Sequence, residues 1–291
     1  MPLGPTLGAT LGPTFGPNLG LTLPGRGPVR APADSDRGAG LSPTDRAKKA
    51  AADRAADFVT DGMRVGLGTG STAAFLVRRL GERVRSEGLR ITGVPTSSRT
   101  ADWARAEGIP LTTLDEAGLL DLTIDGADEF DGRLRLIKGG GAAHLQEKIV
   151  AAASRRMIVI SDPAKKVAVL GAFPLPVEAL TFGLASTLGH IERALGALGY
   201  RDVRITRRMA GDRPLVSDEG NAIVDLHLGR IDDPDRLSVA LNQIPGVVEN
   251  GLFIGLASVV VVGHPDGHAD LIWADEATKS AMTTLAEGAR P

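Results

Sequence analysis

The chain has 291 residues with 33 Lys and Arg against 35 Asp and Glu, a formal net charge of −2, and only 7 Phe, 2 Trp and 1 Tyr. This balance argues against a nucleic-acid-binding protein, because such proteins need clustered basic side chains and aromatic stacking platforms, and it predicts that any anionic ligand is small. The absence of cysteine excludes disulfides, thiolate metal sites and cysteine nucleophiles, and no apolar run approaches the roughly 18 residues that cross a bilayer.

The first 40 residues have the composition of a disordered tail. They hold nine glycines and seven prolines, without a helical or strand period, and bury too little apolar surface to offset the entropy of ordering. A secretory signal is not expected, because the first basic residue is Arg26 and glycine or proline interrupts the apolar residues every few positions. Together with the lack of cysteine, this favours a cytoplasmic location.

From residue 41 on, the pattern predicts alternating helices and strands. A first helix begins at Ser42 and ends by Gly62, and a later one is closed by Gly81. The predicted strands are 63–67, 91–94, 122–125, 134–137 and 157–161, and a further helix covers 142–153. This alternation predicts an α/β fold with a parallel, Rossmann-like sheet wrapped by helices.

The pattern changes after Lys166. The predicted elements are a helix over 177–198, a strand over 203–209, a hairpin over 214–228, a helix over 234–244 and a strand over 252–254. Their order favours a small ferredoxin-like α+β domain. The apolar run 259–262 then predicts a buried strand that returns to the first sheet. The predicted organisation is a tail (1–40), a catalytic α/β domain (41–170 and 257–280) and an inserted α+β domain (171–256).

Five polar segments each follow a predicted strand: 68–72, 96–98, 125–128, 138–141 and 161–165. Because the carboxyl ends of parallel strands meet at one edge of a sheet, where loops and helix N-termini collect, we expect all five segments to lie at one ligand-binding edge.

The segment GLGTGST fits neither common nucleotide motif. A dinucleotide fingerprint needs a glycine where Ser71 stands, and a P-loop needs a lysine between Gly70 and the hydroxyl residues, so neither NAD nor ATP is expected. A glycine turn at a helix start exposes backbone N–H groups beside two hydroxyls, which suits a phosphate monoester or a sugar hydroxyl. The alternative is a well-capped helix without a ligand.

Two further segments carry acid–base groups. The segment DLTIDGADEFD places Asp125, Asp128, Glu129 and Asp131 just past a strand, which suits metal binding, sugar hydroxyl contacts or proton transfer, with a solvated acidic turn as the alternative. No further metal ligand is apparent in the sequence, and the His-Pro-Asp-Gly-His segment at 264–268 is a turn without a third ligand.

The segment KGGGAAHLQEK is the most specific. Three consecutive glycines cost about 1 kcal/mol each relative to alanine, which predicts close approach of a ligand or positive φ angles. Lys138 and Glu147 can then face one cleft, where a carboxylate moves a proton between adjacent carbons while the cation stabilises the oxyanion of an enolisation. The alternative is a flexible connector with surface side chains, and Lys148 is interpreted as a surface residue. Four lysines can supply positive charge for a phosphate, with solvated surface side chains as the alternative: Lys48, Lys49, Lys165 and Lys166.

With these motifs in this order, the chain from about Lys48 to Val262 resembles the type A ribose-5-phosphate isomerases. The resemblance rests on GLGTGST, DGADE, KGGGAA followed by EK, the stretch FPLPVEA, SDEGN and IPGVVENGLF. It implies interconversion of D-ribose 5-phosphate and D-ribulose 5-phosphate through an enediolate in the pentose phosphate pathway. It also implies a small sugar phosphate as the partner, no metal or other cofactor, and a homodimer or homotetramer that the small domain helps to assemble.

The resemblance also implies roles for individual residues. Glu147 is the base that moves a proton between C1 and C2, Lys138 and the three glycines steady the oxyanion, and Asp125 and Asp128 assist ring opening and hydroxyl transfer. Lys48 and Lys165 are the expected phosphate ligands. The implied substrate-binding set is Lys48, Thr69, Gly70, Ser71, Thr72, Asp125, Gly126, Ala127, Asp128, Lys138, Gly139, Gly140, Gly141 and Lys165.

One departure from the family pattern affects the site. The family has a Leu-Thr-Arg-like stretch before the glutamate, and this chain has His144, Leu145 and Gln146 there, which removes a positive charge next to Glu147. We expect this loss to raise the pKa of the base or to alter the rate.

Two rival functions fit the sequence less well. An amino-sugar-phosphate isomerase/deaminase does not explain KGGG with a glutamate nine residues after the lysine. A sugar-phosphate sensor of the kind found in bacterial repressors carries a winged DNA-binding module upstream, and residues 1–40 contain no helix-turn-helix pattern.

Overall fold

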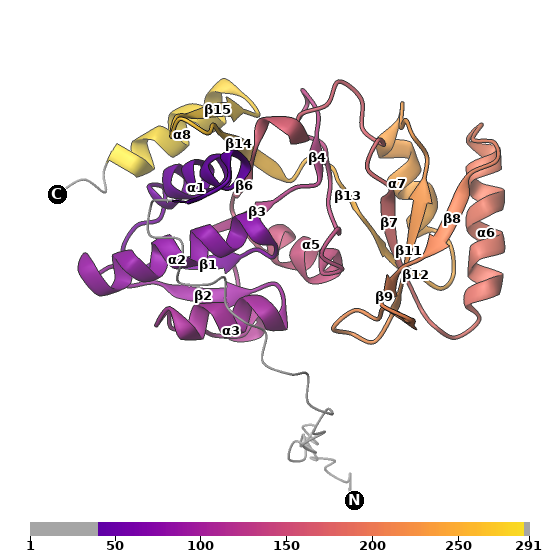
Figure 1. Ribbon diagram of the computed structural model, residues 1–291, viewed down its shortest axis with the longest axis horizontal. Helices are drawn as coiled ribbons and strands as arrows, with labels where there is room; N and C mark the ends of the chain where they lie inside the picture. The colour runs from indigo at the N-terminus through magenta and orange to yellow at the C-terminus, as the bar shows by residue number, and fades with distance from the viewer. Residues whose placement is uncertain (1–39, 288–291) are drawn as a thin grey trace, which may run out of the picture. The chain divides into compact units, whose positions relative to one another are not determined.

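The computed structural model describes residues 40–287, and all of them belong to one compact unit. The predicted disordered tail, residues 1–40, therefore lies outside the described residues except for Gly40. The longer helices of the described chain (Figure 1) are α1 (Pro43–Ala56), α2 (Ser71–Ser86), α3 (Ser98–Ala106), α5 (His144–Ala152), α6 (Leu184–Ala197), α7 (Pro234–Asn242) and α8 (Glu276–Glu287), with short turns at α4 (Leu114–Ala117) and η2 (Pro163–Lys165).

The main sheet of the described residues has six strands in the order β15-β14-β6-β3-β1-β2. All neighbouring strands are parallel except β15, which is antiparallel to β14. The strands are β1 (Arg64–Leu67), β2 (Thr92–Pro95), β3 (Leu122–Gly126), β6 (Met157–Ser161), β14 (Ala257–Gly263) and β15 (Ala269–Trp273). The predicted Rossmann-like sheet is confirmed, and so is the return of the 259–262 run to it through β14.

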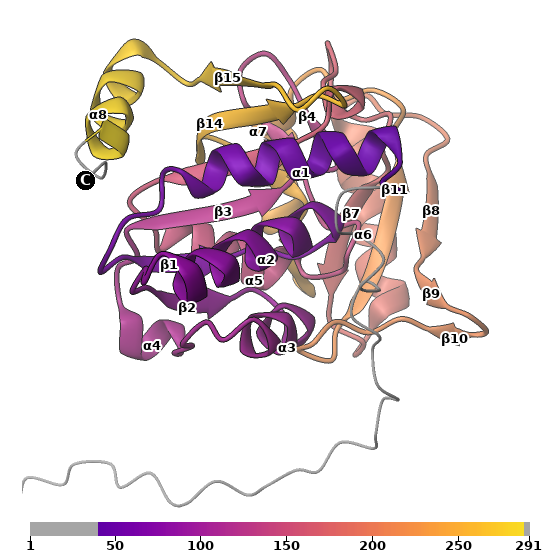
Figure 2. The ribbon, with the colours of Figure 1, turned by 60° about the vertical axis from the view of Figure 1, so that its left-hand side comes forward.

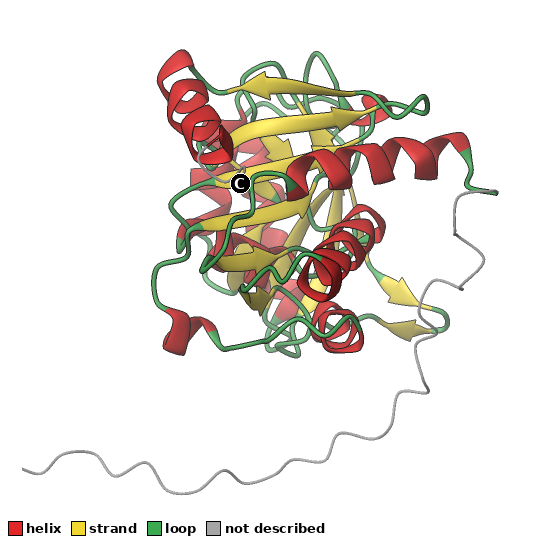
Figure 3. Ribbon diagram, turned by 90° about the vertical axis from the view of Figure 1, so that its left-hand side faces the viewer, coloured by secondary structure: helices red, strands yellow, loops and turns green. Residues whose placement is uncertain are grey.

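Both faces of this sheet are covered at its centre, which explains why the strands β6 and β14 are largely apolar. On β6, Ile158 and Ile160 pack with α1 and α2 on one face, whereas Met157 and Val159 pack on the other face with Ala151 of α5. Figure 2 shows α1 and α2 in front of the sheet, with α1 running along the direction of β3 and β14, and Figure 3 shows the helices in red against the yellow strands. A parallel strand that is buried on both faces reads as a continuous apolar run rather than an alternating one.

A second sheet has the order β12-β7-β11-β8 and is antiparallel throughout. Its strands are β7 (Leu175–Ala179), β8 (Arg204–Arg207), β11 (Ala222–His227) and β12 (Val247–Asn250), and a short hairpin of β9 (Met209–Ala210) and β10 (Arg213–Pro214) projects from it (Figure 2). With α6 and α7 the element order is β-α-β-β-α-β, which confirms the ferredoxin-like prediction. The domain boundaries at 170/171 and 256/257 stay a prediction.

The predicted helix over 177–198 is wrong in its first part. Residues 175–179 form β7, because this apolar stretch pairs with β11 and β12 on its two sides. The helix α6 starts only after Gly183, whose left-handed backbone (φ 67°) separates it from the strand. The strand β12 was not predicted. The turn of the predicted hairpin over 214–228 is present, because Val216 and Ala222 form an antiparallel bridge around it, but residues 213–214 form β10 and pair with β9 rather than with β11.

The predicted strand 134–137 is not part of the parallel sheet. Residues Leu136–Ile137 form β5, which pairs antiparallel with β4 (Glu129–Phe130) and with β13 (Leu252–Phe253). The reason lies in the short connection from β4 to β5, because a turn of this length joins only antiparallel strands, whereas a parallel pair needs a long crossover.

Gly81 does not close a helix, since α2 continues to Ser86 and Gly81 packs inside it against Glu107. In residues 40–287 no helix combines the length and apolar character that a membrane span requires.

Candidate active site

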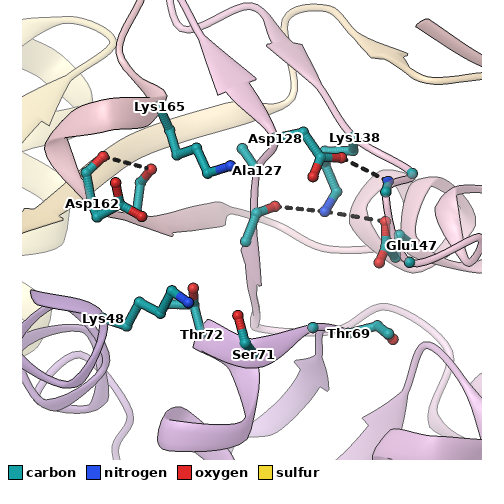
Figure 4. A pocket seen from close by; sticks show the side chains of 16 residues that line it. Lys48, Thr69, Ser71, Thr72, Ala127, Asp128, Lys138, Glu147, Asp162 and Lys165 are labelled. Atoms are coloured by element: carbon teal, nitrogen blue, oxygen red, sulfur yellow. Dashed lines mark hydrogen bonds and ion pairs between the residues drawn. The ribbon is translucent and has the colours of Figure 1, made fainter. Parts of the chain in front are cut away.

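A cleft of about 150 Å³ lies where the carboxyl ends of β1, β3 and β6 meet the glycine loop before α5 (Figure 4). It is lined by Lys48, Thr69, Gly70, Ser71, Thr72, Gly126, Ala127, Asp128, Lys138, Gly139, Gly140, Gly141, Glu147, Ser161, Asp162 and Lys165. Thirteen of the fourteen implied substrate-binding residues are in this set, together with Glu147. The structure therefore brings together residues that are up to 117 positions apart in the chain.

A buried lysine between two carboxylates forms one end of the cleft. Lys138 Nζ lies 3.0 Å from Asp125 Oδ2 and 3.1 Å from Glu147 Oε2, and it donates a hydrogen bond of 2.6 Å to the carbonyl of Gly126. Asp125, Lys138 and Glu147 are 0%, 2% and 3% exposed. Charges this far from water persist only when they are paired, so the three side chains titrate and react as one cluster.

Asp125 does not line the cleft and lies beneath it. It ends β3, and its Oδ1 accepts hydrogen bonds from the backbone N–H of Thr69 at 3.0 Å and of Gly126 at 2.7 Å. Gly68 allows this approach, because a Cβ there would lie 2.1 Å from Asp125 Oδ1. The glycine-rich turn after β1 is thus needed for contact with Asp125 as well as for the helix start.

The triple-glycine loop has the special conformation that its sequence predicted. Gly139 has a φ of 108°, a region that favours glycine, and a Cβ on Gly140 would lie 2.6 Å from Asp128 Oδ1. The N–H of Gly140 donates to Asp128 Oδ2 at 2.7 Å. Asp128 therefore fixes the loop while its carboxylate lines the cleft.

The burial of this cluster shifts the pKa of each member. Burial raises the pKa of Glu147 to about 8, and the charge of Asp125 adds to this rise while Lys138 opposes it. Burial also raises the pKa of Asp125, against the opposing effects of Lys138 and the Gly126 and Thr69 amides. For Lys138, burial alone lowers the pKa, but Asp125 and Glu147 outweigh it, so the pKa is raised. Because only Asp125 accepts two backbone N–H bonds, we assign the titrating proton to Glu147.

These shifts predict the pH dependence of the reaction. A base accepts a proton only when it is ionised, so we expect kcat/KM to rise almost tenfold per pH unit as the pH approaches about 8 and to level off above it. Initial rates between pH 6.5 and 9.5 measure this profile. A profile that is flat across this range would contradict the assignment of Glu147 as the ionising base.

The other end of the cleft suits an anion. Ser71 and Thr72 begin α2, whose first residues have free N–H groups, and the preceding Gly70 (φ 117°) provides no side-chain cap. Figure 4 shows Lys48 and Lys165 on this side of the cleft, away from Lys138 and Glu147. Two ammonium groups and a helix N-terminus are typical of phosphate sites.

Two cleft residues were missing from the predicted set. Ser161 ends β6, and Asp162 follows it, where its Oδ1 accepts a 3.0 Å hydrogen bond from the N–H of Ala164 and caps the turn that carries Lys165. The signal was present, because both residues belong to the polar segment 161–165 that follows a predicted strand.

Several predicted candidates have other roles in the structure. The segment 96–98 does not line the cleft, contrary to the expectation that all five polar segments meet there. Instead, Thr96 Oγ1 and Ser97 Oγ lie 2.9 and 2.8 Å from Thr69 Oγ1 and support the turn after β1 from behind. Glu129 accepts a 2.7 Å hydrogen bond from the N–H of Gly171, and Asp131 pairs with Arg135 at 2.6 Å.

The interpretation of Lys148 as a surface residue is wrong. Its side chain is only 15% exposed, pairs with Glu249 at 2.8 Å and donates to the carbonyl of Asn250 at 2.7 Å. It therefore ties α5 to the second sheet. Lys166 is exposed, and Lys49 forms a surface ion pair with Asp53.

The stretch before Glu147 carries no positive charge in the structure. His144 is buried, and this burial lowers its pKa to about 4, so it is neutral at neutral pH. Gln146 is hydrogen-bonded to Glu219. The effect of this substitution on the base stays a prediction.

Within residues 40–287, no three His, Cys, Asp or Glu side chains gather in a way that can hold a metal ion. His264 and His268 both contact Asp270 at 2.9 Å in the turn between β14 and β15.

A lysine–carboxylate cluster at one end of a cleft and cations beside a helix N-terminus at the other are typical of an enzyme that transfers protons on a small phosphorylated substrate. Comparison with known proteins specifies the class. The family model for ribose 5-phosphate isomerase A (phosphoriboisomerase A) matches residues 92–267. The ribose-5-phosphate isomerase A of Cereibacter sphaeroides (strain KD131 / KCTC 12085) is 64% identical over 231 residues, covering 79% of this chain and 88% of that protein.

Solved structures agree. The ribose 5-phosphate isomerase A from Methanocaldococcus jannaschii is 41% identical with a TM-score of 0.70, covering 78% of this chain and 97% of that one. A D-ribose-5-phosphate isomerase in complex with phospho-erythronic acid is 37% identical with a TM-score of 0.72, covering 79% and 99%. The chain belongs to the ribose 5-phosphate isomerase A family, and the resemblance found in its motifs is confirmed.

Proposed function

We propose that this chain interconverts D-ribose 5-phosphate and D-ribulose 5-phosphate, with Glu147 moving a proton between C1 and C2 of the open-chain sugar. The observation that carries this proposal is the ion pair of Glu147 and Lys138, 3.1 Å apart in a cleft whose other end suits a phosphate. Family membership supports the same substrate.

In the aldose-to-ketose direction, Glu147 takes the proton from C2. The C2–H electron pair forms the C1–C2 double bond, and the carbonyl electrons pass to O1 to give the enediolate. Glu147 then delivers a proton to C1, in some turnovers after exchange with solvent, and the O2 hydroxyl proton passes to O1, so that a carbonyl forms at C2. Asp128 lines the cleft and is the group that we propose for hydroxyl proton transfer and ring opening, with Asp125 supporting it from beneath.

The buried cluster keeps its charge during this step. Before the transfer, Lys138 balances the negative charge of Glu147. After the transfer Glu147 is neutral, and the enediolate carries the negative charge beside the same ammonium group. Because no new charge is created in a site of low dielectric, the cluster stabilises the transition state without reorganising its charges.

The second end of the cleft binds the phosphate in this proposal. Lys48 and Lys165 supply charge, and the start of α2 at Ser71 and Thr72 supplies N–H and hydroxyl donors. Phospho-erythronic acid, the compound in the related structure, carries a carboxylate and a phosphate, the two kinds of charge that the enediolate also carries. We propose that it binds this cleft in the same way.

We also propose that the chain acts without a metal or other cofactor, and that it is a cytoplasmic homodimer or homotetramer. Its proposed catalytic domain comprises residues 41–170 and 257–280, and its proposed small domain comprises residues 171–256. The exposed apolar side chains of the second sheet and its loops, among them Phe182 (91% exposed) and Met209 (49%), support an assembly surface there.

The direct test uses purified protein treated with EDTA. We expect ketose to form from ribose 5-phosphate at the rate of untreated protein, and no ammonia to be released from glucosamine 6-phosphate in a parallel assay. Ammonia release would favour the amino-sugar-phosphate deaminase alternative. Loss of activity with EDTA and recovery with a divalent ion would instead assign a metal to the acidic residues.

A further inference from the structure

We infer that Arg208, held by Asp225, is a positioning residue that fixes the triple-glycine loop so that a backbone N–H of this loop faces the reacting end of the substrate. Arg208 lies between β8 and β9, outside the cleft lining and outside every motif that the sequence analysis singled out. The inference deepens the proposed function and rests on it for its catalytic consequence.

The guanidinium of Arg208 holds the loop by its carbonyl groups. Nη1 donates to the carbonyl of Gly139 at 2.5 Å and to that of Gly140 at 3.2 Å. The remaining face of the guanidinium is paired with Asp225 of β11, with Nε donating to Oδ2 at 2.9 Å and Nη2 bonded to Oδ1. Both side chains are only 15% exposed, so this two-bond pairing fixes the direction in which Nη1 points.

Peptide geometry converts this contact into the direction of the loop N–H groups. The described chain has no cis peptide bonds, and in a trans peptide the carbonyl and the following N–H point in opposite directions. The first peptide shows this directly, because the Gly139 carbonyl accepts from Arg208 while the Gly140 N–H donates to Asp128 on the other side. By the same geometry, the Gly140 carbonyl on Arg208 turns the N–H of Gly141 toward the Asp128 side, where the cleft lies.

The Gly141 N–H is available for a ligand. Gly141 lines the cleft, and no acceptor within residues 40–287 forms a hydrogen bond with its N–H. Within the loop, the N–H of Ala142 donates to the Gly139 carbonyl at 3.0 Å and closes a turn, with a φ of 108° at Gly139 and 59° at Ala142. The side chains that hold residues 139–140 of this turn against the surrounding described chain are Asp128 and Arg208. A preorganised N–H donor of this kind stabilises a developing oxyanion.

Only an arginine can make this arrangement, because one planar group must pair with a carboxylate through two bonds and still direct a third donor at two carbonyls. A lysine keeps the charge but not the fixed direction. The variants Arg208→Ala and Arg208→Lys therefore separate charge from geometry. Arg207→Ala is the matched control, since Arg207 is the exposed neighbour on β8.

The test measures kinetics and loop protection together. We expect Arg208→Ala and Arg208→Lys to lower kcat about 10- to 100-fold, less than the roughly 10²- to 10³-fold typical for loss of an oxyanion donor, because the N–H is misdirected and not removed. The KM and the affinity for inorganic phosphate should change less than about threefold. Guanidinium at millimolar concentration should restore part of the activity of Arg208→Ala, and urea should not. Hydrogen–deuterium exchange of the peptide covering 138–143 should accelerate in both variants and stay unchanged in Arg207→Ala.

The possible outcomes test the positioning role of Arg208, its catalytic consequence and the proposed function separately. Wild-type exchange at 138–143 in a folded Arg208→Lys variant overturns the positioning role, whatever the activity. Accelerated exchange with unchanged kcat overturns its catalytic consequence. Should Arg208→Ala unfold, Arg208→Lys decides, because it keeps a charge beside Asp225. A wild-type protein that does not isomerise ribose 5-phosphate contradicts the proposed function instead, and the exchange measurement still tests the loop.

Discussion

Replacing Glu147 by Gln is expected to lower kcat by at least 10²- to 10⁴-fold, the range typical of an essential acid–base group. The amide keeps the size of the side chain and still contacts Lys138, but it cannot accept the proton from C2. Binding of phospho-erythronic acid should persist, because the variant removes a negative charge from a cleft that binds an anion. Steady-state kinetics and calorimetric titration measure the two quantities.

The same variant has an expected effect on stability. The folded-state pKa of Glu147 is raised, so between the unfolded-state value of 4.5 and about 8 the unfolded chain is ionised here while the folded protein holds the proton, and the stability falls across this range. Glu147→Gln should therefore raise the Tm at pH 8.5 and leave it nearly unchanged at pH 5. Glu192→Gln, an exposed glutamate on α6, is the control. For the kinetic prediction, a kcat of Glu147→Gln within threefold of the wild-type value would remove Glu147 from the mechanism.

Replacing Lys138 by Met is expected to damage both activity and stability. It removes the cation that balances the enediolate, for which a loss of about 10²- to 10³-fold in kcat is typical. It also leaves Asp125 and Glu147 buried without their partner, and breaking a buried ion pair in this way costs about 3–5 kcal/mol of unfolding free energy. Denaturant titration at pH 8 and kinetics at the same pH measure the two losses.

The stability loss should shrink as the pH falls, because the two carboxyl groups then take up protons and lose their unpaired charge. Lys148→Met is the control, since it removes a less buried ion pair, with Glu249, from a lysine that also lies near the Phe253 ring, whose centroid is 5.3 Å from Lys138 Nζ and 5.0 Å from Lys148 Nζ. If Lys138→Met were as active as Lys148→Met, the charge-balance mechanism would be wrong.

Most residues of the candidate site could be predicted from the local sequence. Asp125, Lys138 and Glu147 each stand at a strand end, a glycine turn or a helix start, and such positions collect at one edge of a parallel sheet. The glycines were informative because their need is steric, as with Gly68 against Asp125 and Gly140 against Asp128. The family resemblance then assigned roles to residues whose chemistry the pattern alone left open.

Two features of the fold depended on partners distant in the chain. The strand β7 reads locally like the start of a helix, and only its pairing with β11 and β12 makes it a strand. The strand β5 was predicted in the wrong sheet, although its short connection to β4 already required an antiparallel pair. Propensity and period do not specify which strands pair.

Arg208 could not have been predicted by any local signal. It contacts Gly139, 69 positions earlier, and its immediate neighbours Arg207 and Met209 are exposed at the edge of the second sheet. Asp125 was predicted to bind substrate but lies beneath the cleft, because the turn after β1 covers it. Such placements follow from tertiary packing rather than from motifs.

In the proposed mechanism, Glu147 moves a proton between C1 and C2 through an enediolate. The most direct test equilibrates ribose 5-phosphate with EDTA-treated enzyme in D₂O and follows C–H signals by NMR. We predict that deuterium accumulates at C2 of the aldose and C1 of the ketose with wild-type enzyme, and that Glu147→Gln incorporates none in the same time. Complete interconversion without any deuterium at either carbon would indicate a hydride shift and would contradict the account.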